Sequence, residues 1–256
     1  ADKPAGRGQR LQESSVKKYA LSQQIPVLQP ISLRDEGFLA QLKAFQADVQ
    51  VVVAFRMLPK VVWQMPRKGT FNLHASLLPD YRGAAPINWA IIGGEATTGV
   101  TTFLIDEQID TGAILLRKEV AIAPRETAGT LHDKLMTVGA DLVVETLALI
   151  ASDKAVPQSQ PKQVVEKPAP KIHKETSHIP WEQSLAQIDR FVRGMSPYPT
   201  AWAQLHHEGE IYAVKIYEAT PQEATHNLPI GRVLLEDKQI KVAVQGGFLK
   251  IESLQF

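Results

Sequence analysis

The chain contains no cysteine among its 256 residues, and this absence excludes disulfides, thiolate metal sites and thiol catalysis. Its formal net charge is only +1, so any contact with nucleic acid has to come from local basic clusters. No unbroken apolar run reaches the length of a membrane span. The opening Ala1-Asp2-Lys3-Pro4 also lacks the apolar core of a signal peptide. We therefore expect a cytoplasmic protein that binds no membrane.

Three polar residues with catalytic potential stand out in two short segments, 70–83 and 109–112. Residues i and i+2 of an extended strand face the same way, so Asn72 and His74 would project side by side. Asp110 follows in a loop between two strand-like runs, 100–105 and 113–120. An amide that donates, an imidazole that exchanges a proton and a carboxylate that orients or charges it make a workable acyl-transfer set.

Each of these residues also has a plainer interpretation. A lone histidine is more often a core residue satisfied by backbone groups, but Asn72 and the run Ser76-Leu77-Leu78-Pro79 favour a functional His74. Asp110 suits a tight turn, which can itself aim the carboxylate. Zinc bound by His74, Asp110 and His132 would lack the H-E-x-x-H spacing. We therefore expect no metal.

Helical and strand patterns alternate along the first part of the chain, which predicts an α/β open sheet. Helices are expected at 36–47, 86–92 and 130–150, and strands at 25–28, 51–55 and 69–75. The apolar strand 51–55 is expected to be buried on both faces. Residues 1–153 are thus predicted to form one domain.

The composition changes after this region. Residues 154–172 are rich in Pro, Gln and Lys, which is typical of an extended interdomain linker. A helix at 181–194 follows, and a C-terminal domain at 173–256 is predicted to be a small antiparallel barrel of the oligonucleotide-binding type. Its five strand-like runs lie at 201–205, 211–217, 232–235, 239–244 and 248–254.

Residues 72–79, together with 81–87 and 109–114, resemble the 10-formyltetrahydrofolate-dependent formyltransferases, and the resemblance covers nearly the whole chain. It implies a Rossmann-like open-sheet catalytic domain followed by an OB-fold-like β-barrel domain. It also implies 10-formyltetrahydrofolate as co-substrate, with Asn72, His74 and Asp110 catalysing direct formyl transfer. The segment Ser76-Leu77-Leu78-Pro79 would line the folate site, and we expect its backbone groups to remain free for the ligand.

Four further segments, 4–10, 82–86, 167–172 and 196–202, resemble the branch of this family that formylates methionyl initiator tRNA. The resemblance implies tRNA contacts by Arg7 and Arg10 in a basic loop and by Lys167 and Lys171 in the linker. Such contacts weaken with rising salt. The residues alone favour a solvated basic loop at 4–10 and leave the same two interpretations open for the linker lysines.

Family members begin with a strand–helix–strand unit before the basic loop and continue beyond the segment that corresponds to residues 253–256. We therefore expect this chain to be part of a longer protein. A monomer is expected, because no strong exposed apolar stripe is visible in the sequence.

Two other functions remain open from the sequence. The folate chemistry could serve an amino sugar, a nucleotide amine or water, and in that case the basic segments and the barrel would have no role. Alternatively, the protein could bind RNA through its barrel and carry a degenerate α/β domain, although Asn72, His74 and Asp110 argue against a non-enzyme.

Overall fold

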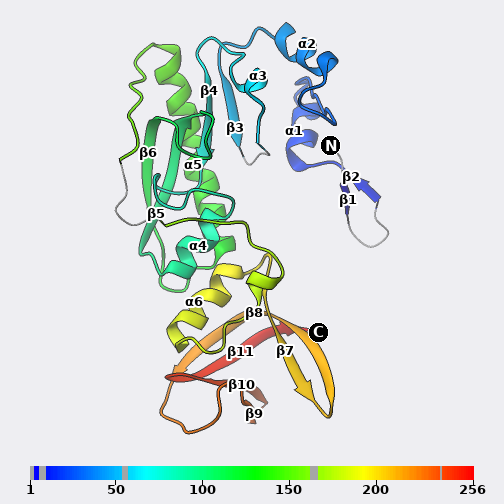
Figure 1. Cartoon of the computed structure of the whole chain (residues 1–256), viewed down its shortest axis with the longest axis vertical. Helices are drawn as coiled ribbons and strands as arrows, with labels where there is room; N and C mark the ends of the chain where they lie inside the picture. Colours follow the sequence, from blue (N-terminus) through cyan, green and yellow to red (C-terminus); the bar gives the residue numbers. More distant parts are fainter. Residues whose placement is uncertain (1–2, 6–9, 54–56, 162–166, 237) are drawn as a thin grey trace. The chain divides into compact units, whose positions relative to one another are not determined.

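The computed structural model describes residues 3–5, 10–53, 57–161, 167–236 and 238–256, with side chains described from Glu13 onward. The chain divides into two compact units, Ala1–Phe71 and Asn72–Phe256. Figure 1 draws the elements of both units, which are described separately below.

The first unit contains short helices and strands, with an irregular segment at residues 23–35. They are β1 (Lys3–Ala5), β2 (Arg10–Gln12), α1 (Ser15–Ser22), α2 (Glu36–Ala44), β3 (Gln50–Val53), α3 (Lys60–Trp63) and the beginning of β4 (Thr70–His74). Strands β1 and β2 pair antiparallel. The hydroxyl of Ser14 caps α1 and the carboxylate of Asp35 caps α2, as their positions before each helix predict.

Two expectations for this unit are wrong. Residues 25–28 form no strand. Strand β3 is not buried on both faces, because Val51 is 38% and Val53 59% exposed while Val52 between them is buried. Alternate residues of a strand face opposite sides, and within the described residues only the side of Val52 is covered.

The second unit begins within β4 and continues the sheet in the order β3-β4-β5-β6. The following elements are α4 (Pro86–Gly93), β5 (Thr97–Leu104), β6 (Ile114–Ala121) and α5 (Ala128–Ala151). Strands β5 and β6 are antiparallel. Helix α5 buries Leu131, Leu135 and Leu142 against Ile91 and Val100, so the apolar stripe predicted for this helix forms the core beside the sheet.

The C-terminal part of this unit is a curled antiparallel sheet with one helix packed on it (Figure 1). Its elements are η1 (Glu175–Ser177), α6 (Leu185–Met195), β7 (Ala201–His207), β8 (Glu210–Glu223), β9 (Val233–Glu236), β10 (Gln239–Val244) and β11 (Gly247–Gln255). The strand order is β7-β8-β11-β10-β9. Ile188, Val192 and Met195 of α6 pack with Ile216 and Leu249 of the sheet. The predicted fold class, an α/β domain followed by a small antiparallel β domain, is confirmed.

A charged network joins α6 to the α/β part inside the second unit. Asp189, which is buried, accepts hydrogen bonds from Arg125 and from Arg193. The other groups of these arginines donate to the backbone carbonyls of Ala219 and Glu126. Because every charge here has a partner, the network holds its elements in one arrangement. No helix in the described ranges combines the length and apolar character needed to cross a bilayer.

Candidate active site

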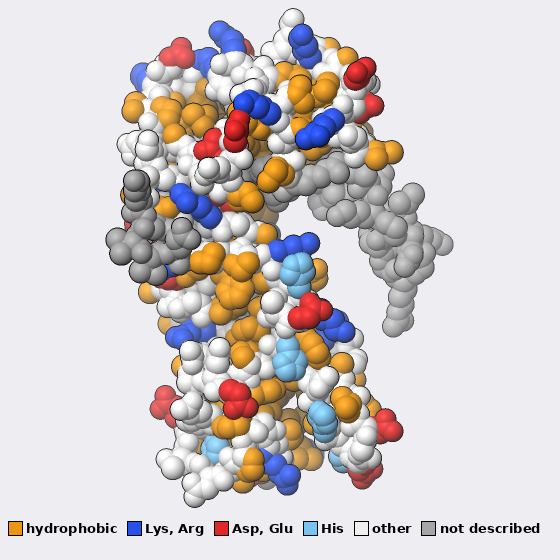
Figure 2. Space-filling view, in the orientation of Figure 1, with side chains coloured by type: hydrophobic (Ala, Val, Ile, Leu, Met, Phe, Trp, Pro, Cys, Tyr) orange, Lys and Arg blue, Asp and Glu red, His pale blue; other side chains and the backbone are white. Residues whose placement is uncertain are grey.

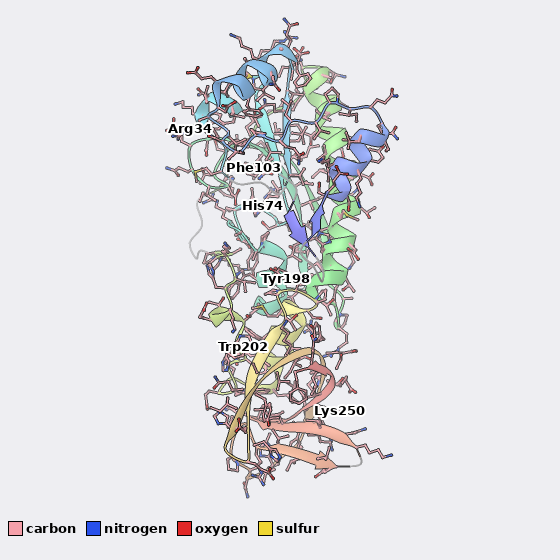
Figure 3. The ribbon with its side chains drawn as sticks, turned by 90° about the vertical axis from the view of Figure 1, so that its right-hand side faces the viewer. Arg34, His74, Phe103, Tyr198, Trp202 and Lys250 are labelled. Carbon is pink, nitrogen blue, oxygen red and sulfur yellow. The ribbon has the colours of Figure 1, made fainter. Side chains whose placement is uncertain are left out.

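Strand β4 places Asn72 and His74 on the same face, and each is only 6% exposed. Leu73 between them packs into the core formed with α5. The i, i+2 prediction therefore holds for this pair. Phe103 stands edge-on to the imidazole, with ring centroids 6.5 Å apart (Figure 3). Together with Leu78 and Ile114, it forms an apolar cluster beside the site.

The hydrogen bonding of His74 defines its tautomer. Nε2 lies 2.9 Å from the backbone oxygen of Tyr81, and because a carbonyl only accepts, Nε2 carries the hydrogen. The other ring nitrogen, Nδ1, lies 3.7 Å from Oδ2 of Asp110, which is beyond direct hydrogen-bond distance. In the neutral ring Nδ1 is thus the basic nitrogen, and a proton arriving there would face a carboxylate.

The side chain of Asn72 leaves one polar atom unsatisfied. Its Oδ1 is buried and has no hydrogen-bond partner among the described residues. Such an atom costs about 1–3 kcal/mol unless a donor reaches it. A carboxamide can present either its oxygen or its NH₂ group to a ligand. Asn72 is therefore poised to bind a substrate that supplies a complementary group.

Asp110 lies in the loop between β5 and β6 with a left-handed backbone, φ +56°. Its Oδ2 accepts a hydrogen bond from the backbone N–H of Gly83 at 2.9 Å. Within the same loop, Thr111 and the backbone N–H of Gln108 donate to the carboxylate of Asp106. The turn predicted for Asp110 is present and places its carboxylate 3.7 Å from Nδ1 of His74, while a catalytic role of this carboxylate remains a prediction.

Several polar groups of the segment predicted to line a folate site are hydrogen-bonded within the protein. The backbone oxygen of Ser76 accepts from Thr101 Oγ1, which in turn accepts from the backbone N–H of Leu78. The backbone oxygen of Leu78 accepts from Arg117, and the hydroxyl of Ser76 donates to the backbone oxygen of Asp80. The expectation that the backbone of this segment remains free is therefore wrong for the oxygens of Ser76 and Leu78 and for the N–H of Leu78, because buried polar groups are paired internally wherever partners are in reach.

Side chains in this segment nevertheless shape the site. Ser76 and Leu78 are fully buried, whereas Leu77 and Pro79 are partly exposed. Leu78 belongs to the apolar cluster next to His74. A role of Ser76, Leu77, Leu78 and Pro79 in folate binding remains a prediction, and these contacts favour packing by side chains over pairing with the main chain.

The described parts of the predicted linker are hydrogen-bonded to the site. Gln158 exchanges two backbone hydrogen bonds with Ile114, which begins β6. Further along, Ala169 forms a parallel bridge with Gly83, and its backbone oxygen accepts from the N–H groups of Ala84 and Ala85. The segment therefore runs beside both loops that carry the site, a feature that its composition did not reveal.

A polar cluster anchors Tyr81, whose carbonyl orients His74. The Tyr81 hydroxyl donates to Glu95 at 2.7 Å, and Lys167 Nζ donates to the same oxygen at 2.7 Å. Burial, followed by the bond to Glu95, raises the pKa of the Tyr81 hydroxyl above its usual range. Burial would raise the pKa of Glu95, but the hydrogen bonds from Lys167 and Tyr81 outweigh it and lower that pKa. The bond to Glu95 raises the pKa of Lys167.

The residues predicted to contact tRNA differ in what the structure shows. Arg7 lies outside the described residues, and only the backbone of Arg10, in β2, is described. Lys167 is paired with Glu95 and with Asp80, so its charge is largely neutralised within the protein. Lys171 is exposed and forms no ion pair with a described residue.

Aromatic and basic side chains lie together near Lys171. Lys174 Nζ lies 5.5 Å from the ring centroid of Trp202, and His178 packs edge-on to the same ring. Figure 3 labels Trp202 at the beginning of the antiparallel sheet. On the described surface that Figure 2 shows, Lys, Arg and His side chains are scattered among apolar and acidic ones. A nucleic-acid contact here would depend on a few specific groups instead of a broad basic field.

The alternative of a zinc site gains no support from the geometry. Across the described ranges, no group of three or more His, Asp or Glu side chains is placed to hold a metal ion. His132 instead lies exposed on α5 and pairs with its neighbour Asp133.

Comparison with known proteins identifies the family of this chain. The family model described as formyl transferase matches residues 1–147, and the model described as formyl transferase, C-terminal domain, matches residues 171–256. The chain belongs to the formyl transferase family, as its motifs predicted.

Its curated relatives indicate a particular branch. The chain is 53% identical to the methionyl-tRNA formyltransferase of Flavobacterium johnsoniae, with all of this chain and 81% of the relative covered. It is 55% identical to the methionyl-tRNA formyltransferase of Parabacteroides distasonis, with 99% of this chain and 81% of the relative covered.

Solved structures with the same fold are more distant. HypX from Aquifex aeolicus in complex with tetrahydrofolic acid gives a TM-score of 0.65 at 23% identity, covering 84% of this chain and 36% of that one. The N-formyltransferase from Helicobacter canadensis, in complex with folinic acid and dTDP-3-aminofucose, gives 0.66 at 18% identity, with 99% and 86% covered. These likenesses concern the fold alone.

Proposed function

We propose that this protein transfers the formyl group of 10-formyltetrahydrofolate to the α-amine of methionine on initiator tRNA. The relatives that are more than half identical over the whole chain are named methionyl-tRNA formyltransferases. The amino-sugar alternative has support only from structures that share the fold at low identity. The observation in the structure that carries the proposal is the buried Oδ1 of Asn72, which has no hydrogen-bond partner among the described residues, on the strand that also carries His74.

The reaction moves a formyl group between two nitrogens. The amine nitrogen bonds to the formyl carbon, the bond from that carbon to N10 of the folate breaks, and the proton lost by the amine balances the one gained by the leaving nitrogen. During the transfer, negative charge develops on the formyl oxygen. Groups already oriented for this charge lower the barrier, because no reorganisation is needed when it appears.

The side chains supply these groups in distinct roles. Asn72 would donate from Nδ2 to the formyl oxygen, while its unpartnered Oδ1 can accept from the amine N–H. Nδ1 of His74 would take the amine proton, because Nε2 already donates to Tyr81. Asp110 would then stabilise the resulting imidazolium across the 3.7 Å that separates it from Nδ1. Leu78, Phe103 and Ile114 form a buried apolar cluster beside the site, and the partly exposed Leu77 and Pro79 would offer apolar contacts to the co-substrate.

The tRNA would be held outside this site by salt-dependent contacts. Of the two predicted linker contacts, Lys171 suits this role, because it is exposed and forms no ion pair with a described residue. Lys174 and Trp202 offer a charge and an aromatic ring beside it. Arg7 and Arg10 keep their predicted role at the acceptor end, whereas Lys167 is better explained as part of the Glu95 cluster. A monomeric, cytoplasmic protein remains our prediction.

The test follows formyl-methionyl product from 10-formyltetrahydrofolate and methionyl initiator tRNA. Replacing Asn72 or His74 with alanine should lower kcat by roughly 10²–10³-fold, as the loss of one pre-oriented donor does. His132→Ala is the matched control, because that histidine is exposed on α5. Uncharged tRNA should yield no product. Equal rates in all variants would refute the site, and formylation of an amino-sugar nucleotide in place of the tRNA would establish the alternative acceptor.

A further inference from the structure

The side chain of Gln160 makes four hydrogen bonds that connect two loops of the active site. Its Nε2 lies 2.8 Å from the backbone oxygen of Asp110 and 2.9 Å from that of Gly112. Its Oε1 lies 2.5 Å from Nη2 and 3.2 Å from Nε of Arg82. Gln160 comes from the segment whose composition predicted a linker, so neither motif nor periodicity indicated any role for it.

The chemistry of these partners fixes the orientation of the amide. Both carbonyls only accept hydrogen bonds and the guanidinium of Arg82 only donates, so NH₂ must face the carbonyls and Oε1 must face the arginine. The reversed amide would oppose oxygen to oxygen and donor to donor. Gln160 uses its two donors and its acceptor fully, and no other uncharged side chain of this size offers the same set.

Gln160 binds the backbone oxygen of Asp110, a residue in a strained backbone conformation. Asp110 has a left-handed backbone, which costs a non-glycine residue some free energy and persists only when its surroundings enforce it. The bond from Gln160 fixes the Asp110 carbonyl, and the bond from Gly83 fixes its carboxylate. Gln160 therefore contacts both sides of this arrangement. It binds the side chain of Arg82, the neighbour of Gly83 in the chain, and the backbone oxygen of Asp110, whose carboxylate Gly83 binds.

We propose that Gln160 is a positioning residue for formyl transfer, which keeps the Asp110 carboxylate directed at Nδ1 of His74. This inference rests on the proposed function, because it assigns Gln160 an effect only through Asp110. Gln160 reaches His74 through Asp110. Its Nε2 lies 2.8 Å from the backbone oxygen of Asp110, and Oδ2 of Asp110 lies 3.7 Å from Nδ1 of His74. Displacing a catalytic group by about 1 Å can lower the rate about 10²-fold.

The sharpest variant is Gln160→Glu, which has nearly the same shape and keeps an acceptor for Arg82. It replaces both donors with an oxygen that faces the carbonyls of Asp110 and Gly112. Gln158→Glu is the matched control, since it adds the same charge two residues away on an exposed side chain, and the two hydrogen bonds between Gln158 and Ile114 are made by backbone groups that the substitution keeps. Gln160→Met, which removes both donors without adding charge, keeps the proposal testable if the glutamate variant does not fold.

The assay compares kcat of formyl transfer with the affinity for 5-formyltetrahydrofolate, measured by calorimetry as a non-transferring probe. Gln160→Glu should lower kcat about 10- to 100-fold while the affinity changes little, and Gln158→Glu should leave both unchanged. Hydrogen exchange of residues 105–113 should be faster in the Gln160 variant alone. A kcat equal to that of the Gln158 control would overturn the proposal.

A double-mutant cycle decides whether Gln160 acts through Asp110. In the Asp110→Asn background, Gln160→Glu should change kcat by less than about threefold, because coupled residues are not additive. An undiminished effect in that background would also overturn the proposal. If Asp110→Asn itself retained full activity, the proposed role of Asp110 would fail and this inference with it. A damaged Asp110→Asn with an unaffected Gln160→Glu would refute the inference alone.

Discussion

Gly83 connects the predicted linker to the carboxylate of Asp110, and replacing it with alanine tests that connection. Its φ of +122° lies where L-residues are strained. A Cβ built on it would lie 2.5 Å from the backbone oxygen of Ala169. The N–H of the same residue donates to Asp110. Gly83→Ala therefore perturbs backbone strain, packing and the site together.

The cost can be estimated from these contacts. Forcing alanine into a sparsely populated backbone region costs about 1–3 kcal/mol. Relief of the clash requires the Ala169 carbonyl to move, and that carbonyl accepts from the N–H groups of Ala84 and Ala85 at 2.8 and 3.2 Å. Two weakened hydrogen bonds add about 1 kcal/mol each. We expect Gly83→Ala to lower the free energy of unfolding by roughly 3–5 kcal/mol.

The chain offers a control that separates strain from packing. Gly209 also has a positive φ, +84°, but a Cβ on it would meet nothing within 4 Å. Gly209→Ala should therefore cost only the backbone strain, about 1–2 kcal/mol. Urea denaturation followed by circular dichroism measures both variants, and formyl-transfer kinetics on the folded fraction should show a reduced kcat for Gly83→Ala alone.

A stability loss in Gly83→Ala no larger than in Gly209→Ala would refute the reasoning, because the Ala169 carbonyl would then not oppose the added methyl group. Unchanged kcat in folded Gly83→Ala would refute the second step, in which this N–H directs Asp110.

Three other variants test separate parts of the molecule. Glu95 has a lowered pKa, so its stabilisation is present above the ordinary value of 4.5 and is lost as pH falls through the folded pKa. Glu95→Gln should therefore lower the free energy of unfolding by about 1 kcal/mol near neutral pH and by little at acid pH, as measured by urea denaturation at both pH values. An equal loss at both would show that the charge of Glu95 is not the source of the stabilisation. Lys171→Ala should raise KM for tRNA and reduce its salt dependence in filter binding, and an unchanged salt slope would remove Lys171 from the interface. Asp189→Ala leaves Arg193, which is mostly buried, without its carboxylate partner. It should lower the free energy of unfolding, measured by urea denaturation, by about 3 kcal/mol. A loss of less than about 1 kcal/mol would mean that the ion pairs of Asp189 are exposed to solvent.

Local patterns predicted the elements whose signals lie within a few residues. The proline at the start of α4 and the Gly94 after its end, with φ +76°, gave the helix its bounds. The five C-terminal strands were found because their apolar alternation and turn residues are local. The strand expected at 25–28 failed because an apolar run flanked by proline also suits an irregular segment.

The pairing of polar groups could not be predicted in the same way. The motif identified Asn72, His74 and Asp110, because residue types and the i, i+2 spacing are written in the chain. The backbone oxygen of Ser76 was expected to be free, but it accepts a hydrogen bond from the hydroxyl of Thr101, which lies on another strand. Hydrogen-bond partners distant in sequence are chosen by folding and leave no local signal.

The sequence by itself thus determined the chemistry available to this protein: an amide and an imidazole on one strand, a carboxylate on a turn, no thiol, and a series of strands in the C-terminal part. Only the tertiary structure decided how that chemistry is held. It placed Gln160 and Ala169 against the loops of Asp110 and Gly83, and it turned the Lys167 charge towards Glu95. The physical reason is that side-chain identity and spacing are local properties, whereas burial and hydrogen-bond pairing depend on which distant segments fold together.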